Sequence, residues 1–261
     1  MKKILIILLA CSVILTACLD SETKTTINAD GSGKMIATVD LSEMLKMMAG
    51  SEKEGGNFVM DTTINIKSFS DTASKMSAYH KALVRDMKIK LLMDMRDLSQ
   101  LQFKVSIDAP FKSLEDFNAL NELMKNNDFD EIFDNAMSNP LLSGDKEDAG
   151  SSKPGDNLFA SVFPAIFNCK YSKNSIVCKV DSVKYKQTLE GLTSMDFNIN
   201  GDMESKMLEA AVFTNTLVLP RKVIKITGDS WKKTNDKELV QTGNYLDLYK
   251  QPGKYEYSIQ Y

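Results

Sequence analysis

A long alternation of apolar and polar side chains over residues 87–111 constrains the fold of this chain more than any other feature. Side chains of a strand point to opposite faces in turn, so a period of two gathers one kind of side chain on one face. The pattern predicts two long strands, 87–96 and 101–111, each with one buried face. Residues 97–100 then connect them as an antiparallel hairpin.

The rest of the chain mixes hairpins with short helices. A Thr-rich segment at 22–28 and a return segment at 34–41 flank Asp30-Gly31, the strongest turn signal present. Helical spacing of apolar residues predicts amphipathic helices at 42–49, 71–86, 114–124 and 202–211. Further strands are predicted at 163–171, 175–180, 183–189, 213–219, 222–227, 238–242 and 254–261. Without a regular strand–helix–strand alternation, the sequence predicts an α+β fold: antiparallel sheets of hairpins with three or four short amphipathic helices.

Residues 128–157 differ from the rest in composition. This segment holds eight acidic and two basic residues, and its second part is rich in Gly, Ser and Asp without periodicity. Such a composition predicts a mobile loop. The loop divides the domain, residues 23–261, into two candidate lobes at 23–127 and 158–261.

The first twenty residues carry the pattern of an export signal. Lys2 and Lys3 precede an uncharged run of 14 residues, 4–17. Crossing a bilayer as a helix takes about 20 apolar residues, so this run is short for a membrane anchor. A basic start, a short apolar core and a small residue at its end indicate a secretory signal peptide over residues 1–17.

The end of that run, Leu15-Thr16-Ala17-Cys18, resembles the lipobox of bacterial lipoproteins. The resemblance implies that the signal is removed before Cys18 and that Cys18 carries acyl chains such as palmitate, with residues 18–22 as a lipidated tether. Two or three acyl chains anchor a protein firmly, whereas one chain binds only marginally. Leu19, and not Asp, follows Cys18, which by the same resemblance favours the outer membrane. An ordinary signal peptide with an incidental cysteine is the alternative.

The lipobox, the Thr-rich strand and the turn Asp30-Gly31-Ser32-Gly33 together resemble a group of uncharacterised bacterial lipoproteins. The resemblance is closest over the first 45 residues. It implies an α+β domain held in the cell envelope, on the periplasmic face of the outer membrane or at the cell surface. The group supplies no catalytic residues, so the resemblance implies an address and no mechanism.

Cys169 and Cys178 remain once Cys11, in the signal, and Cys18 are set aside. If Lys173-Asn174 is the loop of a hairpin, the register places Cys169 directly opposite Cys178. Cα atoms of such a non-hydrogen-bonded pair lie about 4.5 Å apart, within the range that disulfides span. Because exported proteins form disulfides, we expect a structural staple. A redox pair is the alternative, which the absence of Cys-x-x-Cys disfavours.

The residues that most catalytic centres need are scarce. His80 is the single histidine, and its place beside the apolar stripe of a helix predicts a packed or surface residue. No nucleophile elbow or phosphate-binding loop occurs. The 15 methionines predict adaptable packing, with Cu(I) binding as the alternative. We therefore expect no enzyme, no cofactor and no metal.

Two functions fit this inventory. A formal net charge of −3 argues against nucleic acid as a partner, because phosphate binding needs a basic face. The first hypothesis is a membrane-tethered, non-enzymatic module that binds an envelope protein or supports an assembly. The alternative is a carrier or sensor of an apolar ligand such as a lipid, held in a groove between helices 41–48 and 114–124 and the long strands.

Overall fold

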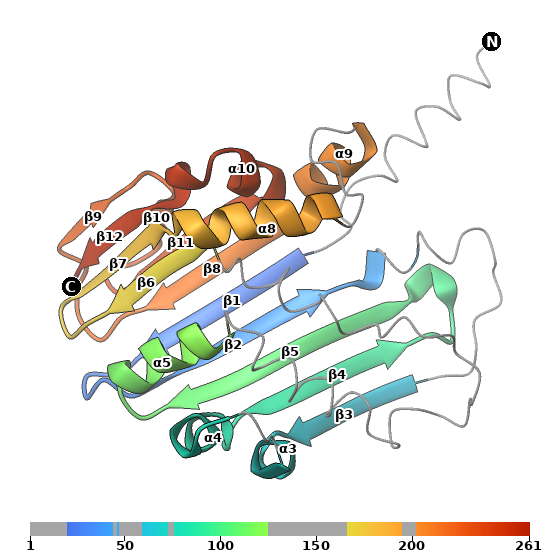
Figure 1. Ribbon diagram of the computed structural model, residues 1–261, viewed down its shortest axis with the longest axis horizontal. Coiled ribbons are helices and arrows are strands. Elements are labelled where there is room, and N and C mark those ends of the chain that lie inside the picture. The colour runs from blue at the N-terminus through green and yellow to red at the C-terminus, as the bar shows by residue number, and fades with distance from the viewer. Residues whose placement is uncertain (1–19, 44–45, 47–58, 73–75, 125–165, 195–201) are drawn as a thin grey trace.

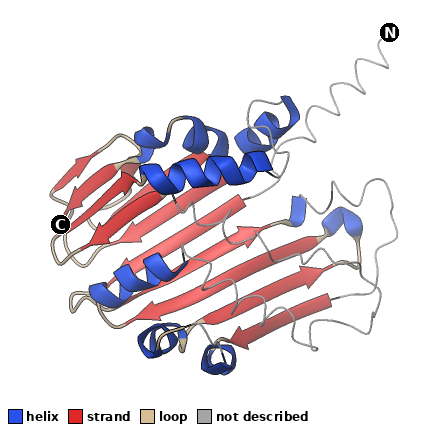
Figure 2. Cartoon of the chain, viewed as in Figure 1, coloured by secondary structure: helices blue, strands red, loops and turns tan. Residues whose placement is uncertain are grey.

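The computed structural model describes residues 20–43, 46, 59–72, 76–124, 166–194 and 202–261. Two sheets and several short helices make an α+β fold, which confirms the predicted class (Figures 1 and 2). The described residues contain six α-helices, more than the three or four expected. One strand pair is parallel, whereas every other pair is antiparallel within the described part of the chain.

The larger sheet has eight strands. In spatial order they are β10 (Trp231–Lys233), β11 (Glu238–Asn244), β8 (Val212–Val218), β1 (Asp20–Ile27), β2 (Gly33–Asp40), β5 (Gln102–Phe111), β4 (Lys88–Asp94) and β3 (Val59–Asn65). The parallel pair is β1 with β8, at the middle of the sheet. Since β8 and β11 follow residue 157 and β1 and β2 precede residue 128, this sheet runs through both candidate lobes.

The smaller sheet has four strands and faces one half of the larger sheet. Its order is β6 (Phe167–Tyr171), β7 (Ser175–Val180), β12 (Tyr257–Gln260) and β9 (Lys225–Thr227). Ile176 and Ile259 from this sheet share a buried cluster with Leu217 and Leu239 from the larger sheet. The apolar faces of the two sheets therefore pack against each other.

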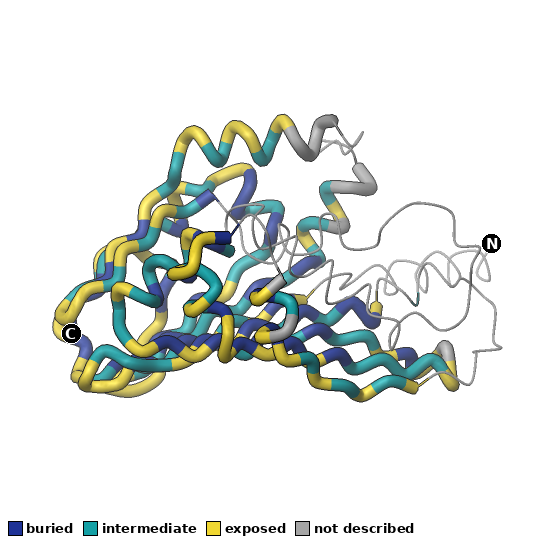
Figure 3. Tube along the Cα trace, turned by 60° about the horizontal axis from the view of Figure 1, so that its bottom comes forward, coloured by how far each residue is buried: buried dark blue, intermediate teal, exposed yellow. Residues whose placement is uncertain are grey.

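The helices and the smaller sheet lie on one side of the eight-stranded sheet (Figure 3). The helices are α3 (Lys67–Thr72), α4 (Ala78–Val84), α5 (Leu114–Met124), α8 (Ser182–Ser194), α9 (Asp202–Ala210) and α10 (Tyr245–Lys250). Two short 3-10 turns, η1 (Leu98–Gln100) and η2 (Pro252–Tyr255), complete the described elements. The opposite face carries cross-strand ion pairs such as Lys34–Asp108, 2.7 Å between Nζ and Oδ2, as expected of a solvated sheet face.

The long alternating segment folds as predicted. Strands β4 and β5 pair antiparallel around η1, with Ile89 opposite Ile107 and Leu91 opposite Val105. These four side chains are at most 2% exposed. The first hairpin is also confirmed, and Gly31 in its turn has a φ of 88°, a backbone region that favours glycine.

One predicted helix and one predicted strand were wrong. The expected helix 71–86 is interrupted: α4 starts afresh because the Oγ atom of Ser77 accepts a hydrogen bond from the His80 amide and caps it. The expected strand 183–189 lies inside α8. Asp181 explains this helix, because its carboxylate accepts hydrogen bonds from the amides of Val183 and Lys184 at the N-terminus. Most of the helix expected at 42–49, and the whole acidic loop 128–157, fall outside the described residues.

Candidate functional site

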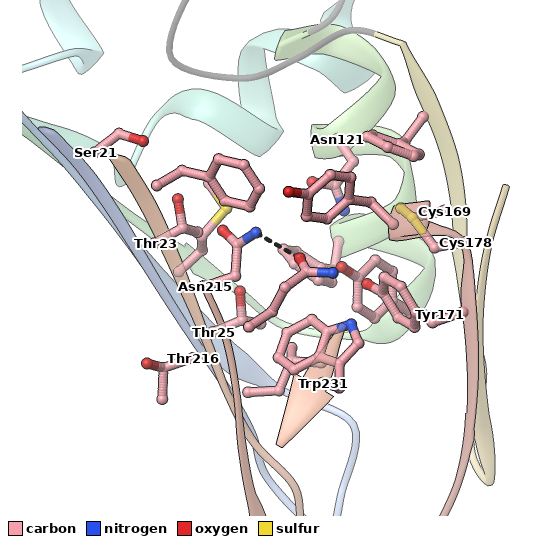
Figure 4. Close-up of a pocket in the computed structure, with 18 of the residues that line it drawn as sticks. Ser21, Thr23, Thr25, Asn121, Cys169, Tyr171, Cys178, Asn215, Thr216 and Trp231 are labelled. Carbon is pink, nitrogen blue, oxygen red and sulfur yellow. Dashed lines mark hydrogen bonds between the residues drawn. A yellow bond between two sulfur atoms is a disulfide. The ribbon is translucent and has the colours of Figure 1, made fainter. Parts of the chain in front are cut away.

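A cavity of about 150 Å³ lies between the two sheets and under helix α5 (Figure 4). Strands β1, β8, β10 and β11 of the larger sheet form one wall, and β6, β7 and β12 of the smaller sheet form the other. Helix α5 closes one side with Phe117, Asn121 and Met124. The cavity therefore draws on segments from both ends of the sequence.

Polar side chains form much of the wall from the larger sheet. Ser21, Thr23 and Thr25 alternate along β1 and all line the cavity. Beside them, the side-chain Nδ2 atom of Asn215 donates a hydrogen bond to Gln241 Oε1 at 3.0 Å. Gln241 Nε2 in turn donates to Ser230 Oγ at 2.8 Å. This chain of hydrogen bonds satisfies a Gln241 side chain that is only 4% exposed.

Aromatic rings supply most of the apolar lining. The rings that line the cavity are Phe117, Phe167, Tyr171, Phe213, Trp231, Tyr255 and Tyr257. They hold one another edge to face: Phe213 and Tyr255 at 5.3 Å between centroids, Trp231 and Tyr257 at 5.1 Å. Gly243 allows this packing on the sheet, because a Cβ there would lie 2.6 Å from the Phe213 ring.

The tyrosines of the lining stay uncharged. Burial raises the pKa of Tyr171 to about 12 and also raises that of Tyr257, whose hydroxyl is hydrogen-bonded to it. Burial likewise raises the pKa of Tyr255. None of the described residues that line the cavity is Asp, Glu, Lys, Arg or His. The described part of the lining is consequently neutral at physiological pH.

The disulfide between Cys169 and Cys178 lies in the wall formed by the smaller sheet (Figure 4). The two residues stand directly opposite each other in the β6–β7 pair, with Cα atoms 4.0 Å apart. The Ser172 amide donates to the Ser175 carbonyl across the predicted two-residue loop. The predicted register is confirmed, and the staple fixes the hairpin that bounds the cavity.

One side chain of α5 fixes the helix against the edge of the smaller sheet. Asn118 Nδ2 donates to the Tyr171 carbonyl at 2.8 Å, and its Oδ1 accepts from the Tyr171 amide at 2.9 Å. The side chain thus replaces a neighbouring strand at the edge of β6. Phe117, the next residue, packs its ring 4.5 Å from the Tyr171 ring. These contacts set the position of α5 over the cavity.

The other residues singled out in the sequence lie away from the cavity. His80 is a half-buried residue on α4, with its ring 5.9 Å from Tyr79. Met93 faces inward between Met60 and Phe103 of neighbouring strands, in agreement with a packing role. Cys18 and Met47 are outside the described residues. Of the two helices expected to border a ligand groove, α5 contributes to the cavity, whereas Leu41 and Ser42 are absent from its lining.

The polar members of the cavity were missed at the sequence level. Thr23, Thr25 and their neighbours belong to a strand with polar residues on both faces, so no alternation assigned an inward side. Trp231 lies on a three-residue strand, too short to leave a periodic pattern. A second amide opposite the first, Gln241 beside Asn215, becomes visible only once β8 and β11 pair.

Two further findings concern the described residues as a whole. No helix in the described ranges combines the length and apolar character that crossing a bilayer requires. Within the same ranges, no three His, Cys, Asp or Glu side chains gather where they could bind a metal ion.

Comparison with known proteins gives only distant likenesses. No family model and no curated sequence matches the chain. The folded domain of LppM from Mycobacterium tuberculosis aligns over 94% of this chain and 90% of its own, with a TM-score of 0.34 and 10% identity. An M1 zinc metallopeptidase from Deinococcus radiodurans aligns over 94% of this chain and 42% of its own, with a TM-score of 0.24 and 8% identity. With TM-scores this low, neither likeness assigns a fold family or a function.

Proposed function

We propose that the chain is a lipid-anchored, non-enzymatic binding protein of the bacterial cell envelope that holds a small, largely apolar ligand between its two sheets. The cavity of about 150 Å³ at the centre of the molecule carries this proposal. The lipobox-like residues Leu15-Thr16-Ala17-Cys18 support the anchor, and Leu19 after the cysteine favours the outer membrane.

The size of the cavity supports a binding role. Protein interiors are close-packed, and an empty volume costs about 24 cal/mol per Å³. A fully enclosed, unfilled cavity of about 150 Å³ would cost roughly 4 kcal/mol of stability, and a partly open one costs less. A ligand that fills the cavity recovers much of that free energy.

The lining supports binding without catalysis. General acid–base and nucleophilic chemistry need a titratable or activated side chain within reach of the substrate. The described lining consists of neutral amides, hydroxyls, aromatic rings and Leu and Met side chains, and its two cysteines are joined to each other. These groups can orient a ligand through hydrogen bonds and ring contacts.

Native mass spectrometry tests the binding function. The chain from residue 19 onward keeps every described element, and we expect it to carry a reproducible extra mass when exported and purified gently. Thr25→Leu places a larger apolar side chain on the cavity wall and should remove that mass. Thr26→Leu, on the same strand but outside the lining, is the matched control. A bare mass for the unsubstituted chain, together with no saturable binding of added apolar compounds, would contradict the proposal.

The anchor has its own test. Cells that express the full chain should incorporate labelled palmitate into it, and Cys18→Ser should abolish the label and leave the signal uncleaved. Fractionation of the membranes then locates the labelled protein in the outer or the inner membrane. Label that persists in the Cys18→Ser variant would contradict the lipobox assignment. Binding of an envelope protein stays a prediction, which crosslinking in the same cells tests.

A further inference from the structure

Two hydrogen-bond donors at the cavity lack partners. The Nε1 atom of Trp231, a residue 7% exposed, and the Nδ2 atom of Asn121 are buried without an acceptor. Both residues line the cavity (Figure 4). A buried donor left unsatisfied costs about 1–3 kcal/mol, so such groups are rare in folded proteins. Gln241, which also lines the cavity, differs from them: both the oxygen and the nitrogen of its side-chain amide are hydrogen-bonded.

The described lining of the cavity disfavours charged ligands. An ion transferred into an apolar site without a countercharge is strongly disfavoured. The described lining offers no charged side chain, and burial keeps its tyrosine hydroxyls protonated. An acceptor that takes a hydrogen bond from Trp231 or Asn121 therefore belongs to a neutral group.

Volume and ring content define the body of the ligand. A cavity of this volume in another protein, lined by apolar side chains, takes up benzene. The seven aromatic rings of the lining here offer edges and faces to a flat or cyclic body. A complete long acyl chain is several times larger than the cavity, so only part of such a molecule would fit.

We infer that the cavity takes a small neutral molecule, or the neutral end of a larger one, with a ring-sized apolar body and an oxygen acceptor for Trp231 Nε1, for Asn121 Nδ2 or for both. This inference rests on the proposed binding function and names its ligand class. Carbonyl, ether and ester oxygens fit the requirement, because they accept hydrogen bonds without carrying charge.

The single tryptophan of the chain makes the inference testable by NMR. One indole N–H resonance then reports on Trp231 without assignment of the rest. We would titrate the chain from residue 19 onward with cyclohexanone and with methylenecyclohexane, which has the same shape but no oxygen. Cyclohexanone should shift the indole resonance downfield in a saturable manner, whereas methylenecyclohexane should cause no downfield shift.

Substitutions of the donors separate hydrogen bonding from cavity filling. Asn121→Leu and Trp231→Phe each remove one donor: Leu has nearly the shape of Asn, and Phe keeps one aromatic ring of the larger Trp. At least one of them should weaken cyclohexanone binding by about 2- to 10-fold, the value of one hydrogen bond, and neither should weaken methylenecyclohexane binding. Affinities come from calorimetry, which does not depend on the tryptophan. Thr38→Val on the outer face of the sheet is the control and should change neither affinity.

The possible outcomes distinguish failure of the acceptor requirement from failure of the proposed binding function. Saturable binding of both compounds without a response to Asn121→Leu or Trp231→Phe would overturn the acceptor requirement and leave a general apolar binding site. Binding of neither compound, with the indole N–H in contact with water, would show a hydrated cavity and overturn both.

Discussion

The two halves of the eight-stranded sheet are buried in different ways. Over β2, β5 and β4 the inward side chains are apolar and mostly aliphatic, and Ile89, Leu91 and Ile107 are at most 1% exposed. Over β1, β8 and β11 the inward positions include Thr25, Asn215 and Gln241, and the second sheet lies opposite them. One half is a close-packed core, and the other half encloses a cavity.

The difference shows how one sheet can supply both stability and a site. Aliphatic side chains interdigitate and leave few voids. Amides and hydroxyls must keep their hydrogen-bond partners, and aromatic rings are rigid, so they fill space less completely. We infer that the aliphatic half provides the free energy that allows the other half to remain incompletely filled.

The largest expected loss of stability comes from a truncation in the close-packed half of the sheet. Ile107→Ala removes a side chain that lies between Ala37 and Ile89 in the sheet and is 1% exposed. It should lower the free energy of unfolding by about 3 kcal/mol, as core truncations do. Thr25→Ala, at the cavity wall, should cost about 1 kcal/mol or less, because space is already present there. Urea unfolding of both variants measures the contrast, and equal losses would contradict it.

The next effect concerns the wall of the cavity half. Removing the disulfide with Cys169→Ala and Cys178→Ala together opens a link across a sequence separation of 9 residues. Loop entropy in the unfolded chain then predicts a loss of about 2–3 kcal/mol. Reduction of the unsubstituted protein should lower its free energy of unfolding by the same amount, seen as a lower urea midpoint. An unchanged midpoint after reduction would show that the staple adds nothing to this half.

Two asparagines of α5 sharpen the comparison where the helix meets the cavity half. Asn118 makes two hydrogen bonds to Tyr171, so Asn118→Ala should cost about 1–2 kcal/mol of unfolding free energy. Asn121 has a buried Nδ2 without a partner, so Asn121→Ala should cost less than Asn118→Ala in the absence of ligand. Thermal unfolding ranks the two variants, and the reverse order would refute the assignment of their roles.

The smallest effect lies on the outer face, away from both halves of the core. Burial acts to raise the pKa of Asp40, but hydrogen bonds from Lys104 and Ser42 outweigh it and hold that pKa below its usual 3.8. Since the folded pKa is the lower one, the pair stabilises the protein above about pH 4 and loses this contribution as the pH falls through the folded pKa. Exposure limits the effect to about 1 kcal/mol or less.

Asp40→Asn measures that contribution. The difference in unfolding free energy between the variant and the unsubstituted protein should be constant above about pH 5 and should shrink below pH 4. A difference that does not vary with pH would show that the carboxylate is not stabilised by its partners.

The features predictable from the sequence are those with a local cause. The alternation of Ile89, Leu91 and Val105 determines an inward face, and the spacing of Cys169 and Cys178 around a two-residue loop determines their pairing. Both depend on residues close together in the chain, so period and turn chemistry suffice.

The features that were missed depend on distant partners or on a competing local signal. The parallel pairing of β1 with β8 joins residues nearly 200 positions apart, and no pattern within either strand specifies it. The cavity could not be predicted for the same reason, because its polar wall forms only when β1 pairs with β8. In α8, the Asp181 cap starts a helix where the sequence predicted a strand at 183–189.

The beginning of β1 at Asp20 has a consequence for how the protein stands on a membrane. With Cys18 acylated, one residue, Leu19, would separate the anchor from a central strand, a reach of about 7 Å over two residue steps. The domain would then have little slack, and the start of β1 would lie close to the bilayer. The strand would then run from the bilayer toward the turn at Gly31. This turn and Tyr261, which border one surface hollow, would lie at the end of the domain far from the lipid. The orientation of the domain would follow from its fold and require no second contact with the bilayer.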